Sequence, residues 1–128
     1  MADPIIIGTV ALDSLETPFG RVQDALGGSA CYASIAASFF SKPGLMSIIG
    51  KDFPDKHIKF LNERSIDTAG ISLGDKTFRW QGSYEFDMNE AKTLKTELNA
   101  LECYKVEVPE DYKKAKYVFL ANIDPELQ

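Results

Sequence analysis

The run PIIIGTV at residues 4–10 constrains the fold most, because its β-branched side chains follow one another without polar alternation. A short apolar run of this kind is typical of a strand covered on both faces, as strands of parallel sheets are. Residues 45–50 and 115–125 have the same character and predict two further buried strands, the last ending in polar residues. The chain is therefore expected to contain a parallel sheet.

Two helices are predicted between these strands. Residues 30–40 form the first, and their many alanines and serines indicate close packing against a sheet. The second begins around Asp52 and Pro54, with proline suited to the first turn and a carboxylate near the positive end of the helix dipole, and extends to about Arg64. Strands that alternate with helices in this way predict a three-layer α/β core.

A smaller β structure is expected beside this core. In residues 76–87, aromatic side chains alternate with polar ones, which is typical of a strand with one apolar face. Residues 93–101 return as an antiparallel partner or form a helix, and residues 14–26 contain a Pro-Gly turn between two short segments. The aromatic face consists of Phe78, Trp80, Tyr84 and Phe86.

Charge and length exclude several classes of protein. The 128 residues suffice for one domain or part of one, and no repeat or linker divides them. A net charge of −5 argues against nucleic-acid binding, which needs clustered cations, and the lysines at 113, 114 and 116 are diluted by neighbouring acids. No apolar run approaches 18 residues, so we expect neither a membrane span nor a standard secretion signal.

The single histidine and the two cysteines suggest no catalytic or metal chemistry. Cys31 and Cys103 have neither the number nor the spacing of a disulfide framework or a metal site, and we expect both to be buried thiols in a reducing cytosol. His57 lies among lysines in the second predicted helix and is interpreted as a surface residue. No metal site is predicted.

Gly27 and Gly28 precede the first helix, where two interpretations remain open. Glycines at this place allow a ligand to approach backbone amides at a helix N-terminus, or they allow a tight loop with positive φ. Asp13 follows the first strand, at the edge where open α/β sheets place ligands, and its carboxylate can accept hydrogen bonds from two sugar hydroxyls or cap nearby amides. Neither a GxGxxG dinucleotide turn nor a GxxxxGK[ST] phosphate loop occurs, which argues against a Rossmann-type nucleotide-binding domain.

Taken together, these motifs resemble the N-terminal half of the ribokinase-like, PfkB-type family of carbohydrate and nucleoside kinases. The resemblance covers essentially the whole chain and is carried by IIIGTVALD, GGSACYASIAA, IIGKD, SIDTAGI and NIDPE. It implies the N-terminal part of a Rossmann-like ribokinase fold, a single partial domain over residues 1–128, with a small β-sheet lid made of about 14–26 and 76–101.

The resemblance also implies a set of substrate-binding residues. They are Asp13, Gly27, Gly28, Ser29, Tyr32, Thr77 and Asn122. Ser29 and Tyr32 replace the lysine and asparagine that many members carry, and a phenol can stack on a ring but cannot offer the paired donor and acceptor of an amide. Asp55 replaces the usual second glycine of the G-x-D-x-x-G turn, which suggests a divergent subfamily with an unnamed sugar or nucleoside as substrate.

For the activity, the resemblance implies phosphoryl transfer from ATP with Mg²⁺ to a hydroxymethyl group. In the family the catalytic aspartate, its glycine-rich loop and the adenine pocket belong to the C-terminal half, so no catalytic residue is expected here and the chain should be inactive alone. We expect the protein to be cytoplasmic and to form a homodimer through the lid. We also expect an exposed edge of the sheet, which should make the 128-residue chain oligomeric or poorly stable. The alternative is a non-catalytic sugar-binding or dimerisation module.

Overall fold

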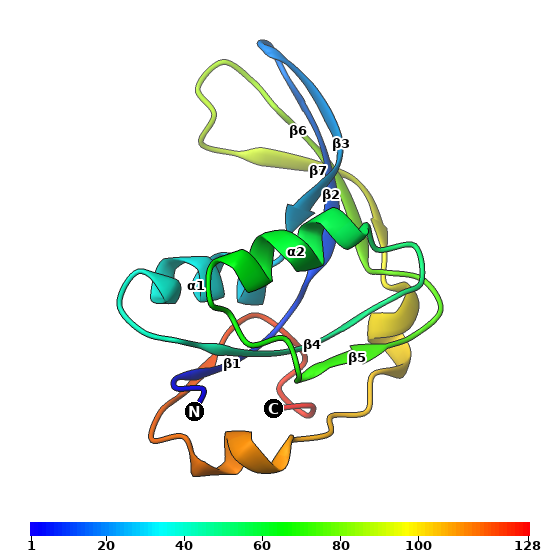
Figure 1. The fold of residues 1–128 in the computed structure, drawn as a ribbon. Coiled ribbons are helices and arrows are strands. Elements are labelled where there is room, and N and C mark those ends of the chain that lie inside the picture. Colours follow the sequence, from blue (N-terminus) through cyan, green and yellow to red (C-terminus); the bar gives the residue numbers. More distant parts are fainter.

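The computed structural model describes all 128 residues and contains two four-stranded sheets (Figure 1). In the first sheet all strands are parallel, in the order β5-β4-β1-β8. Its strands are β1 (Ile5–Ile7), β4 (Gly44–Ile49), β5 (Ile71–Leu73) and β8 (Val118–Leu120). The predicted parallel sheet is thus confirmed, although β1 and β8 each contain only three residues.

Both faces of the first sheet are covered, which explains its unbroken apolar strands. Ile6 of β1 packs in the core cluster that includes residues of helices α1 (Ser29–Ser38) and α2 (Asp55–Glu63). Ile5 and Ile7 point to the opposite face, where they pack with Tyr112. That face is covered by two 3₁₀ helices, η1 (Asn99–Cys103) and η2 (Glu110–Lys114), of which η2 is drawn below the sheet in Figure 1. The three-layer α/β class is confirmed, with 3₁₀ turns forming the third layer.

The second sheet projects from the first beyond α1 and α2 (Figure 1). Its order is β3-β2-β6-β7, with β2 and β6 parallel and the two outer pairs antiparallel. The strands are β2 (Ala11–Thr17), β3 (Gly20–Gly27), β6 (Arg79–Tyr84) and β7 (Ala91–Glu97). Residues 91–97 are therefore a strand rather than the competing helix, and the chain becomes helical only at η1.

The start of α2 differs from the prediction. Pro54 is the N-cap with extended backbone, and Asp55 rather than Asp52 is the acidic residue of the first turn. Asp52 remains outside the helix because its carboxylate accepts hydrogen bonds from the backbone N–H and the hydroxyl of Thr77. The acidic residue assigned to the helix dipole therefore connects the two sheets.

The cysteine prediction is half correct. Cys31 in α1 is buried, but Cys103 at the end of η1 is exposed, because the 3₁₀ helix covers the sheet with its other residues.

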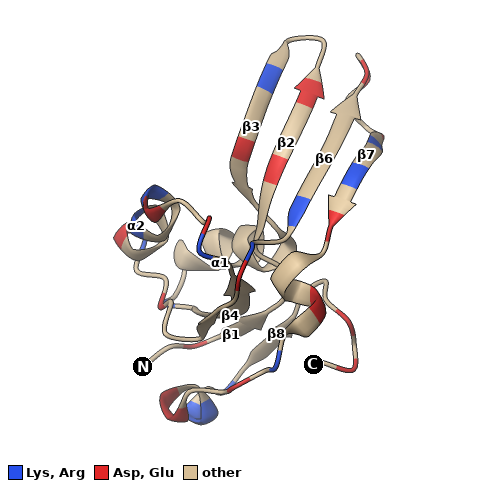
Figure 2. Cartoon of the chain, turned by 90° about the vertical axis from the view of Figure 1, so that its right-hand side faces the viewer, with Lys and Arg blue, Asp and Glu red and all other residues tan.

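The lysine cluster is solvent-exposed as expected, with Lys113 paired to Glu110 and Lys114 to Asp111. The second sheet carries both signs of charge, with acidic positions alone on β2 and a basic one on β6 (Figure 2). No helix in the structure has the length and apolarity to cross a bilayer.

Candidate functional site

The candidate site lies where the second sheet joins the first helix. Asp13 of β2 and Gly27 of β3 are on adjacent antiparallel strands, and a Cβ built on Gly27 would overlap the Asp13 carboxylate. Glycine at position 27 thus leaves space that the carboxylate occupies. The structure thus brings together Asp13 and Gly27, two of the substrate-binding residues that the resemblance implies.

The Asp13 carboxylate has no partner within the chain, since no hydrogen bond or ion pair reaches it, in contrast to Asp24, Asp52 and Asp67. Burial raises its pKa from the ordinary 3.8 to about 6, because a charged carboxylate loses hydration there. A half-buried carboxylate without internal donors is suited to accept hydrogen bonds from a ligand.

Aromatic side chains lie on the Asp13 face of the second sheet and on the nearby helix α1. Trp80 of β6 is the register partner of Asp13 on one side, so the two side chains lie on the same face of the second sheet. Tyr84, four residues further along β6, shares that face. Tyr32 of α1 is 59% exposed, and its pKa is raised by partial burial, by the Asp13 charge and, more weakly, by Tyr84. Asp13 therefore shares its surroundings with Tyr32 and Tyr84, whereas the Trp80 indole lies against Gly82 and donates from Nε1 to Oγ1 of Thr93 at 3.2 Å.

Gly28 has a conformational requirement of its own. Its φ is 99°, which favours glycine, and a Cβ would overlap the backbone of Thr9. The first amides of α1 already donate to Thr9, the N–H of Ser29 to Oγ1 at 3.0 Å and that of Ala30 to the carbonyl at 3.0 Å. Of the two interpretations left open for the glycine pair, the tight loop accounts for Gly28, while Gly27 borders Asp13.

Ser29 and Asn122 are also brought together, but through protein contacts. The backbone N–H of Asn122 donates to Oγ of Ser29 at 2.9 Å. The Ser29 hydroxyl in turn donates to the backbone carbonyl of Asn122 at 3.1 Å. These bonds join the end of β8 to the start of α1. The Asn122 side chain is exposed and makes no hydrogen bond within the chain, so it remains free to contact a ligand.

Thr77 is completely buried at the entry to β6. Its hydroxyl donates to Oδ1 of Asp52 at 2.8 Å and accepts from the N–H of Gly50 at 2.9 Å. A Cβ on Gly50 would overlap the backbone of Lys76 and Thr77, so glycine permits this close approach. The polar atoms of Thr77 are engaged inside the protein, at the connection between the two sheets.

Sequence reasoning missed how Trp80 and Tyr84 relate to Asp13, and it missed a polar cluster around Arg79. Parallel pairing of β2 with β6 produces both, and these strands are separated by more than sixty residues. The alternation of aromatic and polar residues in residues 76–87 identified the strand but not its neighbour.

The residues of this chain do not fit ATP or Mg²⁺. No group of three His, Cys, Asp or Glu side chains is arranged to hold a metal ion, and no glycine-rich phosphate loop occurs in the sequence.

Comparison with known proteins identifies relatives in sequence. No protein-family profile matches the chain. The cytidine kinase of Thermococcus kodakarensis is 33% identical over 130 aligned positions, which include the whole of this chain and 46% of that enzyme. The chain thus spans about half the length of the curated relative that it matches.

Comparison with solved structures identifies the fold. A candidate Ribokinase II from E. coli in complex with ATP and Mg²⁺ has a TM-score of 0.71 at 17% identity, over 94% of this chain and 42% of its own. The nucleoside kinase of Methanocaldococcus jannaschii, described as an archaeal member of the ribokinase family, has a TM-score of 0.65 at 16% identity, over 96% and 46%. The ribokinase of Cryptococcus neoformans in complex with ADP has a TM-score of 0.67 at 15% identity, over 94% and 42%.

Proposed function

We propose that the chain is the acceptor-binding part of a ribokinase-like, PfkB-type sugar or nucleoside kinase, because it is similar over its whole length to about half of a cytidine kinase and shares the fold of ribokinase-family structures. The reaction would be transfer of a phosphoryl group from ATP to a hydroxymethyl group of a sugar or nucleoside. The observation that supports this role most directly is the unpartnered Asp13 carboxylate next to Gly27.

In this proposal Asp13 accepts hydrogen bonds from two hydroxyls of the acceptor. Hydrogen bonds to a charged group contribute about 1.5–3 kcal/mol each, more than those between neutral groups. Gly27 leaves room for the carboxylate, and Tyr32 can stack on a ring of the acceptor. These contacts orient the acceptor, and orientation lowers the barrier of phosphoryl transfer without a covalent role for this chain.

The second sheet would act as the lid over the bound acceptor. Trp80 and Tyr84 on its Asp13 face provide apolar surface that excludes water from the site. The same face includes Val22 at its edge, which is 45% exposed, and we propose that a second copy of the chain covers it in a homodimer. We also propose that the protein is cytoplasmic, a compartment in which thiols such as those of Cys31 and Cys103 stay reduced.

In this proposal ATP, Mg²⁺ and the catalytic base are held by residues outside this chain, which has no group of three metal-ligating side chains and no glycine-rich phosphate loop. The chain alone is then expected to bind the acceptor and to transfer no phosphate. The same misfit supports the second candidate function, a sugar-binding or dimerisation module without catalysis. The two functions differ in whether a complementary half with a glycine-rich turn and an aspartate restores activity.

The proposed function can be tested by calorimetric titration of the chain with cytidine, uridine, adenosine, ribose and fructose. We expect one of these compounds to bind with a stoichiometry of one. Asp13→Asn should weaken it at least tenfold, whereas Asp75→Asn, at an exposed carboxylate away from the site, should not. Absence of binding for all five compounds, or equal affinity in Asp13→Asn, would contradict the role of Asp13.

A further inference from the structure

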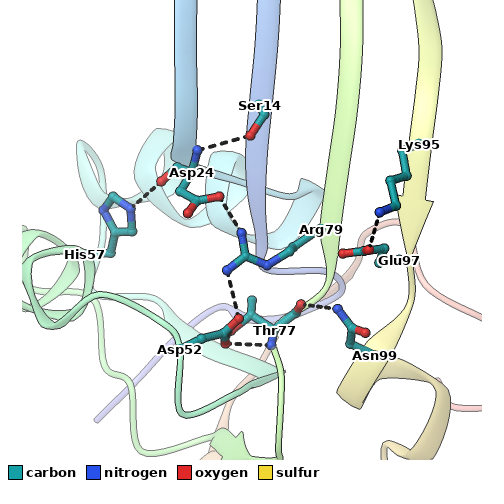
Figure 3. A network of polar contacts seen from close by, with 9 residues as sticks. All are labelled: Ser14, Asp24, Asp52, His57, Thr77, Arg79, Lys95, Glu97 and Asn99. Carbon is teal, nitrogen blue, oxygen red and sulfur yellow. Dashed lines mark hydrogen bonds and ion pairs between the residues drawn. The ribbon is translucent and has the colours of Figure 1, made fainter.

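A polar cluster behind the candidate site joins the two sheets through one guanidinium (Figure 3). Arg79 of β6 donates from Nη1 to the carboxylate of Asp24 in β3, and from Nη2 to Oδ2 of Asp52 at 2.9 Å. The three side chains are only 30%, 36% and 28% exposed, so solvent screens these ion pairs less than those at the open surface.

Asp24 is held in a bulge of β3. The pairing of β2 with β3 shifts register between Asp13 and Leu15, and Asp24 there has a φ of 53°. Its N–H donates to the Ser14 hydroxyl at 3.2 Å, and its carbonyl accepts from Nε2 of His57 in α2 at 3.1 Å. The bulge turns the Asp24 carboxylate toward Arg79 (Figure 3).

Asp52 is held equally firmly on the side of the first sheet. It follows β4, and its Oδ1 accepts from both the N–H and the hydroxyl of Thr77 at 2.8 Å. Burial acts to raise its pKa, but the hydrogen bonds from Thr77 and Arg79 outweigh that effect and lower it. Asn99, the first residue of η1, donates from Nδ2 to the Thr77 carbonyl at 2.9 Å, which connects the third layer to the same cluster.

The cluster lies directly behind Asp13. Trp80 and Ala25 are the register partners of Asp13 on its two sides, and Arg79 and Asp24 each immediately precede one of them. Since successive side chains alternate between faces, Arg79 is on the face opposite to Asp13. The ion pair between Arg79 and Asp24 therefore crosses β2 on the face opposite to Asp13. The hydrogen bond from Arg79 to Asp52 links the second sheet to the first.

We propose that Arg79 is a positioning residue that sets the orientation of the second sheet and thereby the place of Asp13 relative to α1. The part that concerns ligand affinity rests on the function proposed above, whereas the part that concerns orientation does not. A guanidinium is suited to this role because its planar fork donates to two carboxylates at once, while a lysine ammonium holds a less defined geometry. Without the cation, two partly shielded carboxylates would repel each other.

The orientation can be measured by pulsed electron paramagnetic resonance between two spin labels. One label is attached to the exposed Cys103 of η1 and the other to Glu85→Cys at the exposed end of β6, while the buried Cys31 stays unlabelled. We expect one narrow distance distribution with Arg79 and a broader or shifted one in Arg79→Met. Arg79→Lys, which keeps the charge, should lie between the two.

Arg21→Met is the matched control. Arg21 is in strand β3 of the same sheet and pairs only with Glu16 of β2, at 3.6 Å, with its side chain 81% exposed. The control removes the same charge from the same sheet without touching the first sheet, and we expect it to leave the distance distribution unchanged. Thermal unfolding of each variant verifies that the distances refer to folded protein, and Arg79→Lys serves for the comparison with the control if Arg79→Met does not fold.

The effect on Asp13 is measured by the ¹³C NMR titration of its carboxyl carbon and by the affinity for a compound that binds the unmodified chain. Arg79→Met should change the titration midpoint and weaken binding at least fivefold, and Arg79→Lys should partly restore both. An unchanged distance distribution overturns the proposal, and so does a changed distribution with the titration midpoint retained. If no compound binds, the proposed function fails, and the distances and the titration still decide the role of Arg79.

Discussion

The carboxylate of Asp13 occupies the space that a side chain at residue 27 would need. The three atoms nearest to a Cβ built on Gly27 all belong to Asp13, and its backbone has no positive φ that would disfavour alanine. Gly27→Ala should therefore act on the fold through this one neighbour. We expect it to destabilise the chain by about 1–3 kcal/mol, the usual cost of overpacking, measured by chemical denaturation.

A double-mutant cycle isolates this contact. In the Asp13→Ala background the neighbour is removed, and Gly27→Ala should then cost less than about 0.5 kcal/mol. Equal costs in the two backgrounds would mean that Gly27 is required for another reason.

Stability should depend on pH through Asp13. Its folded-state pKa is raised by burial to about 6 from 3.8, so the folded chain binds this proton more tightly than the unfolded chain does. The stabilisation of the folded chain by the protonated Asp13 carboxyl is fully present below about pH 4 and is lost as the pH rises through 6. The unfolding free energy relative to Asp13→Asn should fall between pH 4 and 6 and then stay constant, as measured by denaturation at each pH. A difference that does not vary over this range would contradict the assignment.

Thr77 should matter for stability through its hydroxyl. Thr77→Val keeps the shape but leaves the buried N–H of Gly50 without an acceptor, which we expect to cost about 1–3 kcal/mol. Thr77→Ser keeps the hydroxyl and should cost less. Denaturation of the two variants compares them, and a smaller loss for valine than for serine would show that packing of the methyl group dominates.

Two exposed apolar surfaces predict different modes of self-association. Val118, Phe119 and Leu120 of β8, at one edge of the first sheet, are all more than half exposed, and Val22 lies on the second sheet. We expect the chain to be oligomeric or poorly stable, as judged by analytical ultracentrifugation and a thermal melt. A monodisperse monomer with a cooperative melt at ordinary temperature would contradict this.

Single charged substitutions separate the two surfaces. If the dimer forms through the second sheet as proposed, Val22→Lys should shift the chain toward monomer and Phe119→Lys should not. The reverse result would assign association to the β8 edge, where backbone N–H and C=O groups are unpaired.

Local signals in the sequence predicted the elements well. The isoleucines of β1 identified a strand buried on both faces, because a side chain that faces water on one side of a strand is rarely apolar. Alternation identified β6, and the Pro-Gly turn separated β2 from β3. The resemblance between IIIGTVALD and GGSACYASIAA and kinase motifs brought Asp13 and Gly27 into one hypothesis before any geometry was known.

Contacts between distant segments could not be predicted in this way. Asp52 has the signature of a helix start, but Thr77 binds its carboxylate from 25 residues away. The pairing of β2 with β6 and the ion pairs of Arg79 depend on parallel register, which no single segment encodes. The amino-acid sequence by itself determined the elements and the residue types of the site, because periodicity and turn chemistry act over short ranges. Only the tertiary structure decided that Asp13 is without a partner while Asp24 and Asp52 share Arg79, because such neighbours meet only when the sheets are assembled.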